Sequence, residues 1–222
     1  MRYRHAADVA SARVVIVGAG GHAKVVTDAL RCVAERGGGQ TVVGFVDDNP
    51  TLWGHTVLGL PVLGNLDELR RTGADAVIVA IGDNAARKRV FERVRVDGYR
   101  LVNAIHPTAV IARDVSIGEG VVVFANAVVN AGSVVGSNVI LNTATTVDHD
   151  CTIANHVHLA PGVHAAGGVA IGEGTFVGTG ASVVPYRKIG RWVVLGAGSV
   201  VVDDIPDEAN ATGVPAKIRR GF

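Results

Sequence analysis

The sequence predicts a small α/β domain of Rossmann-like βαβ units followed by an all-β, left-handed parallel β-helix. Short apolar runs alternate with helical patterns in the first half, and a six-residue repeat occupies the second half. The 29 glycines and the aromatic content of only 5% are typical of a turn-rich chain whose core consists of aliphatic side chains.

The first half alternates between two kinds of pattern. Apolar runs bounded by turn residues indicate strands, and apolar residues three or four apart indicate helices. We expect strands at residues 13–17, 41–46 and 75–81, and helices after residue 23, at 65–71 and at 85–96. Such alternation favours a parallel sheet, in which ligands bind beyond the carboxyl ends of the strands.

Those carboxyl ends have polar or glycine-rich sequences. The first strand leads into GAGGHA at residues 18–23, the second into Asp47-Asp48, and the third into Gly82-Asp83-Asn84. Glycines allow close approach of a phosphate or ribose, and a helix N-terminus favours negative charge. This edge therefore suits a nucleotide diphosphate. The aspartates have a simpler alternative role, which is to cap the following turn.

The second half repeats every six residues. From Ile105 to Val201, sixteen of seventeen such positions are Ile, Val or Leu, and Ala165 is the exception. Each hexad makes a short strand and a corner, three hexads make one triangular coil, and stacked coils bury a column of aliphatics. We divide the chain into a leader at 1–12, an α/β domain at 13–104 and a β-helix with a tail at 105–222.

Charge and composition exclude several partners. The 21 basic and 20 acidic residues create no field that would attract nucleic acid or an anionic membrane. No apolar run approaches the roughly 20 residues that span a bilayer, and residues 1–10 lack the apolar stretch of a secretory signal. We interpret Cys32 and Cys151 as reduced core thiols and expect a cytoplasmic protein.

Several motifs together resemble the bacterial nucleotide-sugar 4-amino N-acetyltransferases of the bacillosamine and perosamine type. The resemblance covers nearly the whole chain from about residue 13. The motifs are GAGGHAKVV at 18–26, VDD at 46–48, IGDN at 81–84, NAIHPTAVI at 103–111, NTATTVDHDC at 142–151 and GVPAK at 213–217.

This resemblance implies acetyl transfer from acetyl-CoA to the 4-amino group of GDP-perosamine or a UDP-linked 4-amino sugar, for surface glycan biosynthesis. GDP-perosamine is the favoured acceptor. The family's base falls on His149, and its acidic neighbour, often Glu in the family, falls on Asp150. The family also implies a homotrimer with active sites at subunit interfaces, and no metal.

The resemblance also assigns two binding sets. The nucleotide sugar would contact Gly20, His22, Asp47, Asp48, Gly82 and Asn84. Acetyl-CoA would contact His158, Gly178, Gly196, Pro215 and Lys217. Without the resemblance, His158 and His164 could simply decorate a solvent-exposed face, and Cys151 is expected to pack rather than react.

The chemistry of His149 agrees with this assignment. An amine that attacks a thioester must lose a proton, and a neutral imidazole accepts one at neutral pH. A main-chain N–H is the expected donor to the oxyanion.

Three alternatives remain open at the level of sequence. The first is a sugar O-acetyltransferase of the sialic-acid type. The second is a hydratase that holds zinc with three histidines across a subunit interface, for which His149, His156, His158 and His164 are the candidates. The third is a non-catalytic nucleotide-binding scaffold.

Overall fold

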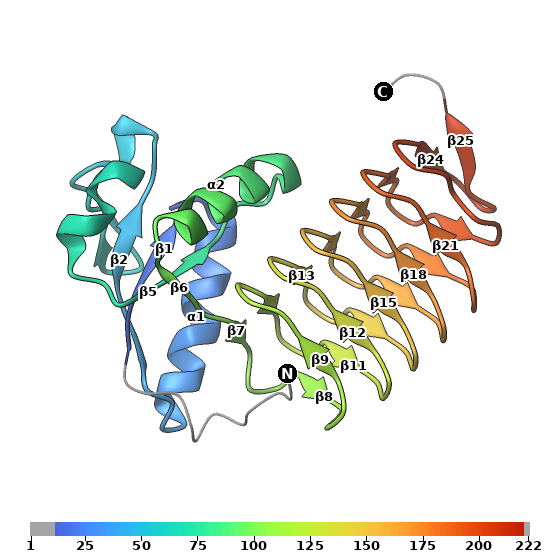
Figure 1. The fold of residues 1–222 in the computed structure, drawn as a ribbon, viewed down its shortest axis with the longest axis horizontal. Coiled ribbons are helices and arrows are strands. Elements are labelled where there is room, and N and C mark those ends of the chain that lie inside the picture. The colour runs from blue at the N-terminus through green and yellow to red at the C-terminus, as the bar shows by residue number, and fades with distance from the viewer. Residues whose placement is uncertain (1–11, 220–222) are drawn as a thin grey trace. The chain divides into compact units, whose positions relative to one another are not determined.

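The computed structural model describes residues 12–219, which form two compact units (Figure 1). The boundary along the chain falls between Pro107 and Thr108. The first is an α/β unit, and the second is a parallel β-solenoid, so the predicted fold class is confirmed. Most of the leader predicted at 1–12 lies outside the described residues, but Ala12 already begins the first strand.

A four-stranded parallel sheet with the order β2-β1-β5-β6 forms the centre of the α/β unit. Its strands are β1 (Ala12–Val17), β2 (Gln40–Val46), β5 (Ala76–Val79) and β6 (Arg100–Leu101). The β1 and β5 strands are almost wholly buried, as expected for central parallel strands.

Two α-helices and several short elements surround this sheet. The helix α1 spans Gly21–Glu35 and α2 spans Asn84–Val96. The segment predicted as a helix at 65–71 is the 3-10 helix η3. The short elements are η2 (Pro50–Leu52), β3 (Thr56–Val57), β4 (Leu60–Pro61) and η3 (Leu66–Thr72). The next strand, β7 (Ala104–Ile105), is the first strand of a solenoid sheet.

The solenoid consists of two-residue strands, each of which ends on a residue of the predicted hexad column. These strands are β8 (Val110–Ile111), β9 (Ser116–Ile117), β10 (Val122–Val123), β11 (Val128–Val129), β12 (Val134–Val135), β13 (Ile140–Leu141), β14 (Thr146–Val147), β15 (Thr152–Ile153), β16 (His158–Leu159), β17 (His164–Ala165), β18 (Ala170–Ile171), β19 (Phe176–Val177), β20 (Ser182–Val183), β21 (Lys188–Ile189), β22 (Val194–Leu195) and β23 (Val200–Val201). The chain then closes with β24 (Asn210–Thr212) and the antiparallel β25 (Lys217–Arg219).

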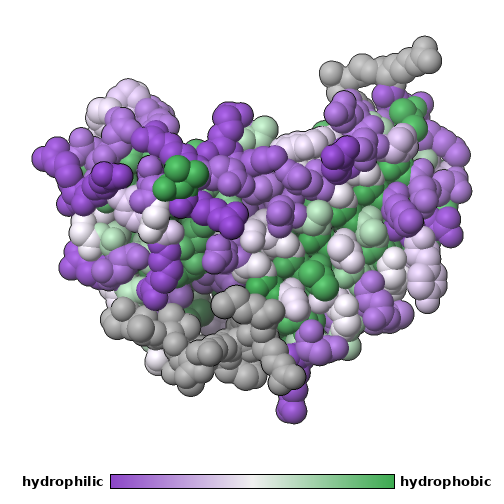
Figure 2. Space-filling view, viewed as in Figure 1, coloured by the Kyte–Doolittle hydropathy of each residue, from purple (hydrophilic) through white to green (hydrophobic). Residues whose placement is uncertain are grey.

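Three parallel sheets form the faces of the solenoid. Face I contains β7, β10, β13, β16, β19, β22, β24 and β25; face II contains β8, β11, β14, β17, β20 and β23; face III contains β9, β12, β15, β18 and β21. Residues 18 apart therefore pair on neighbouring coils, as Thr146 pairs with His164. In the space-filling view, apolar side chains form a stripe along the coils between more polar ones (Figure 2).

Most corners of the coils turn through a left-handed residue. One column of corners contains Gly132, Asp150, Gly168 and Tyr186, all at φ between 58° and 74°. Glycine adopts this conformation at little cost, and Asp tolerates it better than most side chains. No helix among residues 12–219 is long and apolar enough to cross a membrane.

We expect Val177→Ala to lower the free energy of unfolding by about 2 kcal/mol, because it empties space in a fully buried position. Val110→Ala is the control, since the same change at a residue 62% exposed should cost no more than about 0.5 kcal/mol. Urea unfolding measures both. Equal losses would contradict the assignment of the hexad column as the core.

Candidate functional site

His149 and Asp150 form a hydrogen-bonded pair at the corner that follows β14. His149 Nδ1 donates to Asp150 Oδ2 at 2.9 Å. The buried Val147 anchors the end of the strand, and Asp150 makes the left-handed turn at φ 58°. About half of the His149 side chain is exposed, so its imidazole is accessible to a substrate.

The surroundings of the pair raise the basicity of the imidazole. The hydrogen bond to Asp150 raises the pKa of His149, as do the charges of Asp148 and Asp150. Because Nδ1 carries the proton that is donated to Asp150, the lone pair of a neutral His149 is on Nε2. This is the arrangement of a general base that is held by a carboxylate.

Asp148 is a third member of the site, and sequence reasoning missed it. Its Oδ1 accepts hydrogen bonds of 2.8 Å from Asn130 Nδ2 and from the backbone N–H of His149. The Asn130 hydrogen bond and then the His149 N–H lower the pKa of Asp148, so the carboxylate stays charged near the base. Asn130 and Asp148 are 18 residues apart in the sequence, and this spacing could have predicted that they lie side by side on neighbouring coils.

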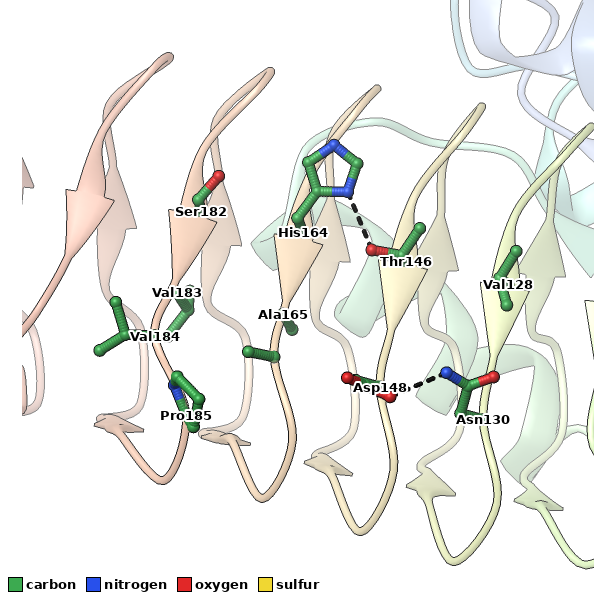
Figure 3. A pocket seen from close by; sticks show the side chains of 11 residues that line it. Val128, Asn130, Thr146, Asp148, His164, Ala165, Ser182, Val183, Val184 and Pro185 are labelled. Carbon is green, nitrogen blue, oxygen red and sulfur yellow. Dashed lines mark hydrogen bonds between the residues drawn. The ribbon is translucent and has the colours of Figure 1, made fainter.

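An open pocket of about 510 Å³ lies on face II beside this corner (Figure 3). Figure 3 shows Asn130 and Asp148 joined by a hydrogen bond on one side, and Thr146 joined to His164 Nδ1 on the other. The lining residues are Val128, Asn130, Thr146, Asp148, His164, Ala165, Ala166, Ser182, Val183, Val184 and Pro185.

His158 is buried on face I, so the alternative that it decorates a solvent-exposed face is wrong. It is 8% exposed and packs edge-on against Phe176, with ring centroids 5.1 Å apart. Asn142 Nδ2 donates to its Nε2 at 3.3 Å. The strand before His149 belongs to face II. The two predicted histidines therefore belong to different parts of the prism within one chain.

The other predicted acetyl-CoA residues lie farther along the chain. A Cβ on Gly178 would lie 2.6 Å from backbone atoms of Leu195 and Ala197, and one on Gly196 would lie 2.7 Å from Thr212 Oγ1. Tight coil stacking therefore already requires both glycines. Pro215 and Lys217 are exposed where the chain turns back from β24 into β25.

The glycine turn connects β1 to the start of α1. Gly18 has φ +101°, and a Cβ there would lie 2.8 Å from the carbonyl oxygen of Ala80, so this residue must be glycine. Gly20 caps α1 without a side-chain hydrogen bond, and space is open around the Cβ positions of Gly20 and Gly21. The first turn of α1 thus lacks a side-chain cap. His22 is half-buried in that turn.

Asp47 and Asp48 brace the neighbouring loops. The two carboxylate oxygens of Asp47 accept from Ala19 N at 2.8 Å and from Asn49 N at 2.9 Å. Asp48 accepts from Leu66 N at 3.2 Å. The capping role considered from sequence is therefore present. Each oxygen retains further acceptor capacity for a ligand.

Gly82 and Asn84 lie where β5 leads into α2. Gly82 is exposed, with open space around its Cβ position, and Asn84 is buried in the first turn of α2. Asp83 is the N-cap and accepts from Ala86 N at 2.7 Å.

Arg87 is a buried cation that sequence reasoning missed. It is 1% exposed, and its Nη1 donates to the carbonyl oxygens of Ile81 and Gly82 at 3.1 and 3.3 Å. Burial lowers its pKa to about 10, so it remains charged at neutral pH. Burial, with a contribution from Arg87, lowers the pKa of His22 to about 4 and keeps that imidazole neutral.

One group within residues 12–219 has ligand atoms close enough to hold a metal ion. Asp28 and Cys32 on α1 lie with His106, all ligand atoms within 4.8 Å of one another. The pKa of Cys32 is raised by burial and by the charges of Asp28 and Glu35, which favours the thiol over the metal-binding thiolate. His149, His156, His158 and His164 do not form such a group in the described chain.

The fold is that of a left-handed β-helix acyltransferase with an added N-terminal domain. Residues 13–94 match the model of the PglD N-terminal domain. A histidine variant of perosamine N-acetyltransferase from Caulobacter crescentus, solved with CoA and GDP-perosamine, has a TM-score of 0.89 and 45% identity. The match covers 97% of this chain and 100% of that chain.

Two further relatives are also acetyltransferases. The acetyltransferase domain of PglB from Neisseria gonorrhoeae has a TM-score of 0.85 and 38% identity, over 93% of this chain and 99% of that one. The UDP-N-acetylbacillosamine N-acetyltransferase of Bacillus subtilis is 37% identical over 114 residues, which is 50% of this chain and 51% of that protein. The match thus spans about half the length of that curated relative. The chain belongs to the perosamine and bacillosamine N-acetyltransferase family.

We expect Arg87→Met to raise the pKa of His22 above about 4, because the nearby positive charge is lost while the burial remains. Loss of the two carbonyl contacts should also cost roughly 2–3 kcal/mol of stability. NMR titration and urea unfolding measure these effects. Arg89→Met, at an exposed position of the same helix, is the control and should change neither. An unchanged His22 pKa in folded Arg87→Met would contradict this electrostatic contact.

Proposed function

We propose that this protein transfers the acetyl group of acetyl-CoA to the 4-amino group of a nucleotide-linked amino-deoxy sugar. GDP-perosamine is the favoured acceptor, with a UDP-linked 4-amino sugar as the second candidate. The 45% identity to the C. crescentus perosamine enzyme over nearly the full chain supports this order, since the B. subtilis bacillosamine enzyme matches over only half.

The hydrogen-bonded pair of His149 and Asp150 is the observation on which the mechanism rests. The sugar amine attacks the thioester carbon as Nε2 of His149 removes its proton, and the new C–N bond forms a tetrahedral oxyanion. Collapse breaks the C–S bond. The imidazolium then returns the proton to the CoA thiolate, which gives free CoA and the acetamido sugar. A main-chain N–H is the proposed donor to the oxyanion.

The nucleotide part of the acceptor is assigned to the glycine turn and the two neighbouring strand ends. The uncapped first turn of α1 and the open space at Gly20 and Gly82 suit a diphosphate. The buried charge of Arg87 adds positive potential. His22 is neutral, so it can hydrogen-bond to the ligand without the cost of burying a charged imidazole. Asp47, Asp48 and Asn84 complete the proposed contacts.

Acetyl-CoA is assigned to His158, Gly178, Gly196, Pro215 and Lys217. His158 is held by Asn142 on face I, and the ammonium of Lys217 is exposed and able to pair with a phosphate. Gly178 and Gly196 belong to the same proposed set, and coil stacking requires glycine at both positions.

A homotrimer would bring the two parts of the site together. His149 follows a strand of face II and His158 belongs to face I. Within one chain, the proposed base and the proposed thioester site are therefore on different faces. Apposition of two prisms in a threefold assembly would place different faces of neighbouring subunits side by side. Exposed valines on all three faces, Val110, Val134 and Val194, offer apolar contact area.

Both proposed substrates are cytoplasmic metabolites, so we assign the protein to the cytoplasm.

Thiol release from acetyl-CoA tests the reaction. We expect rapid release with GDP-perosamine or a UDP-linked 4-amino sugar, and a roughly 100-fold or larger loss of kcat in His149→Ala, since a general base contributes about that much. His55→Ala is the control, because this residue is outside the proposed site. Product mass spectrometry identifies the acetamide.

Release with a sugar hydroxyl acceptor but with neither amine would replace the proposed reaction with O-acetylation. Wild-type turnover by folded His149→Ala would refute its role as the base.

The pH dependence of kcat tests Asp150. The base must be neutral to act, so the rate falls as the pH drops through the pKa of His149. Because the hydrogen bond to Asp150 raises that pKa, Asp150→Asn should move the acidic limb of the profile to lower pH and lower the plateau. A limb that stays in place would show that Asp150 does not tune the base.

A further inference from the structure

The imidazole of His149 lies over a residue that has no side chain. Gly167, one coil further along the solenoid, is buried, and a Cβ built on it would lie 2.5 Å from both Cε1 and Nε2 of His149. The third nearest atom is Cδ2 of the same ring, at 3.2 Å. The ring therefore rests against the Cα of Gly167, and any side chain there would occupy its space.

Neither backbone conformation nor coil stacking requires glycine at this position. Gly168, the next residue, has φ +68°, whereas Gly167 is not among the residues with positive φ. A Cβ on Gly172, in the same coil, would meet backbone atoms of Gly190 and Arg191, whereas the atoms nearest to a Cβ on Gly167 belong only to the His149 ring. An alanine at 167 is thus compatible with the fold but not with the ring in its observed place.

A second glycine lies against the partner carboxylate. A Cβ on Gly132, one coil before Asp150, would collide with Oδ1 of Asp150. The two glycines therefore flank the pair from neighbouring coils. A backbone hydrogen bond holds Gly167 beside His149, because the N–H of the next residue, Gly168, donates to the carbonyl oxygen of His149 at 2.9 Å.

We propose that Gly167 is a positioning residue for acetyl transfer, which leaves room for the imidazole of His149 so that Nδ1 reaches Asp150 and Nε2 faces the acceptor amine. Gly132 leaves the corresponding room for the Asp150 carboxylate. This inference rests on the proposed role of His149 as the base. A methyl group at 167 would meet the Cε1–Nε2 edge, and the ring, as the free end of a flexible side chain, would rotate away.

The test is Gly167→Ala, assayed by thiol release and by NMR titration of His149. We expect kcat to fall by roughly 100-fold, as for loss of a general base, while the KM for each substrate stays within about twofold. The pKa of His149 should fall towards its ordinary value because the contact with Asp150 is lost. A purely structural role would lower stability without this shift in pKa.

Gly132→Ala is a second variant that displaces the carboxylate and leaves the ring in place. It should lower the pKa of His149 with a smaller loss of kcat. The matched control is Gly162→Ala, at φ +68°, where the nearest atom to a new Cβ is 4.0 Å away. That change strains the backbone as much as Gly132→Ala but does not contact the pair, so it should retain wild-type kcat and His149 pKa.

Failure of this inference is distinguishable from failure of the proposed function. Wild-type kcat and an unchanged His149 pKa in Gly167→Ala would overturn the positioning role, while His149→Ala would still test the base. If the wild-type protein transfers acetyl to no amine, the proposed function fails. The His149 titration in Gly167→Ala then still decides whether this glycine holds the ring.

Discussion

Backbone hydrogen bonding between successive coils is the constraint on which the solenoid and its site depend. The coils around the site repeat after 18 residues, so the corner that contains His149 is held between the corners at 131–132 and 167–168. Asp150 N–H donates to the carbonyl oxygen of Ala131, and Gly168 N–H donates to that of His149. A rigid repeat of this kind fixes an exposed side chain more closely than a free loop does, which suits catalytic geometry.

The charged side chains of the two units differ in burial. In the α/β unit the cation Arg87 is buried beneath the loop at residues 81–82, where its carbonyl partners hold it and water does not screen it. In the solenoid the charges of Asp148 and Asp150 are at the surface beside an accessible imidazole. The buried cation is suited to the diphosphate recognition that we propose for the α/β unit, and the half-exposed imidazole is suited to the proton exchange that we propose for the solenoid.

Several residues of the candidate site could not be identified from sequence pattern. Arg87 occupies a helix with many arginines, and nothing in the spacing distinguishes it from its exposed neighbour Arg89. Gly167 belongs to a chain with 29 glycines, most of which serve turns or coil stacking. The burial of His158 was also unexpected, because its outward strand position is covered by Phe176 and Asn142.

The sequence by itself determined the two-part fold, the register of the hexads, the glycine turn and the adjacency of His149 and Asp150. These features depend on the spacing of residues and on which residues are adjacent in the chain, and both are visible in the sequence. Only the tertiary structure decided that Asp148 pairs with Asn130, that Arg87 faces inward and that the His149 ring covers Gly167. The physical reason is that repeat spacing places residues on neighbouring coils, but side-chain packing selects the rotamers that make contact.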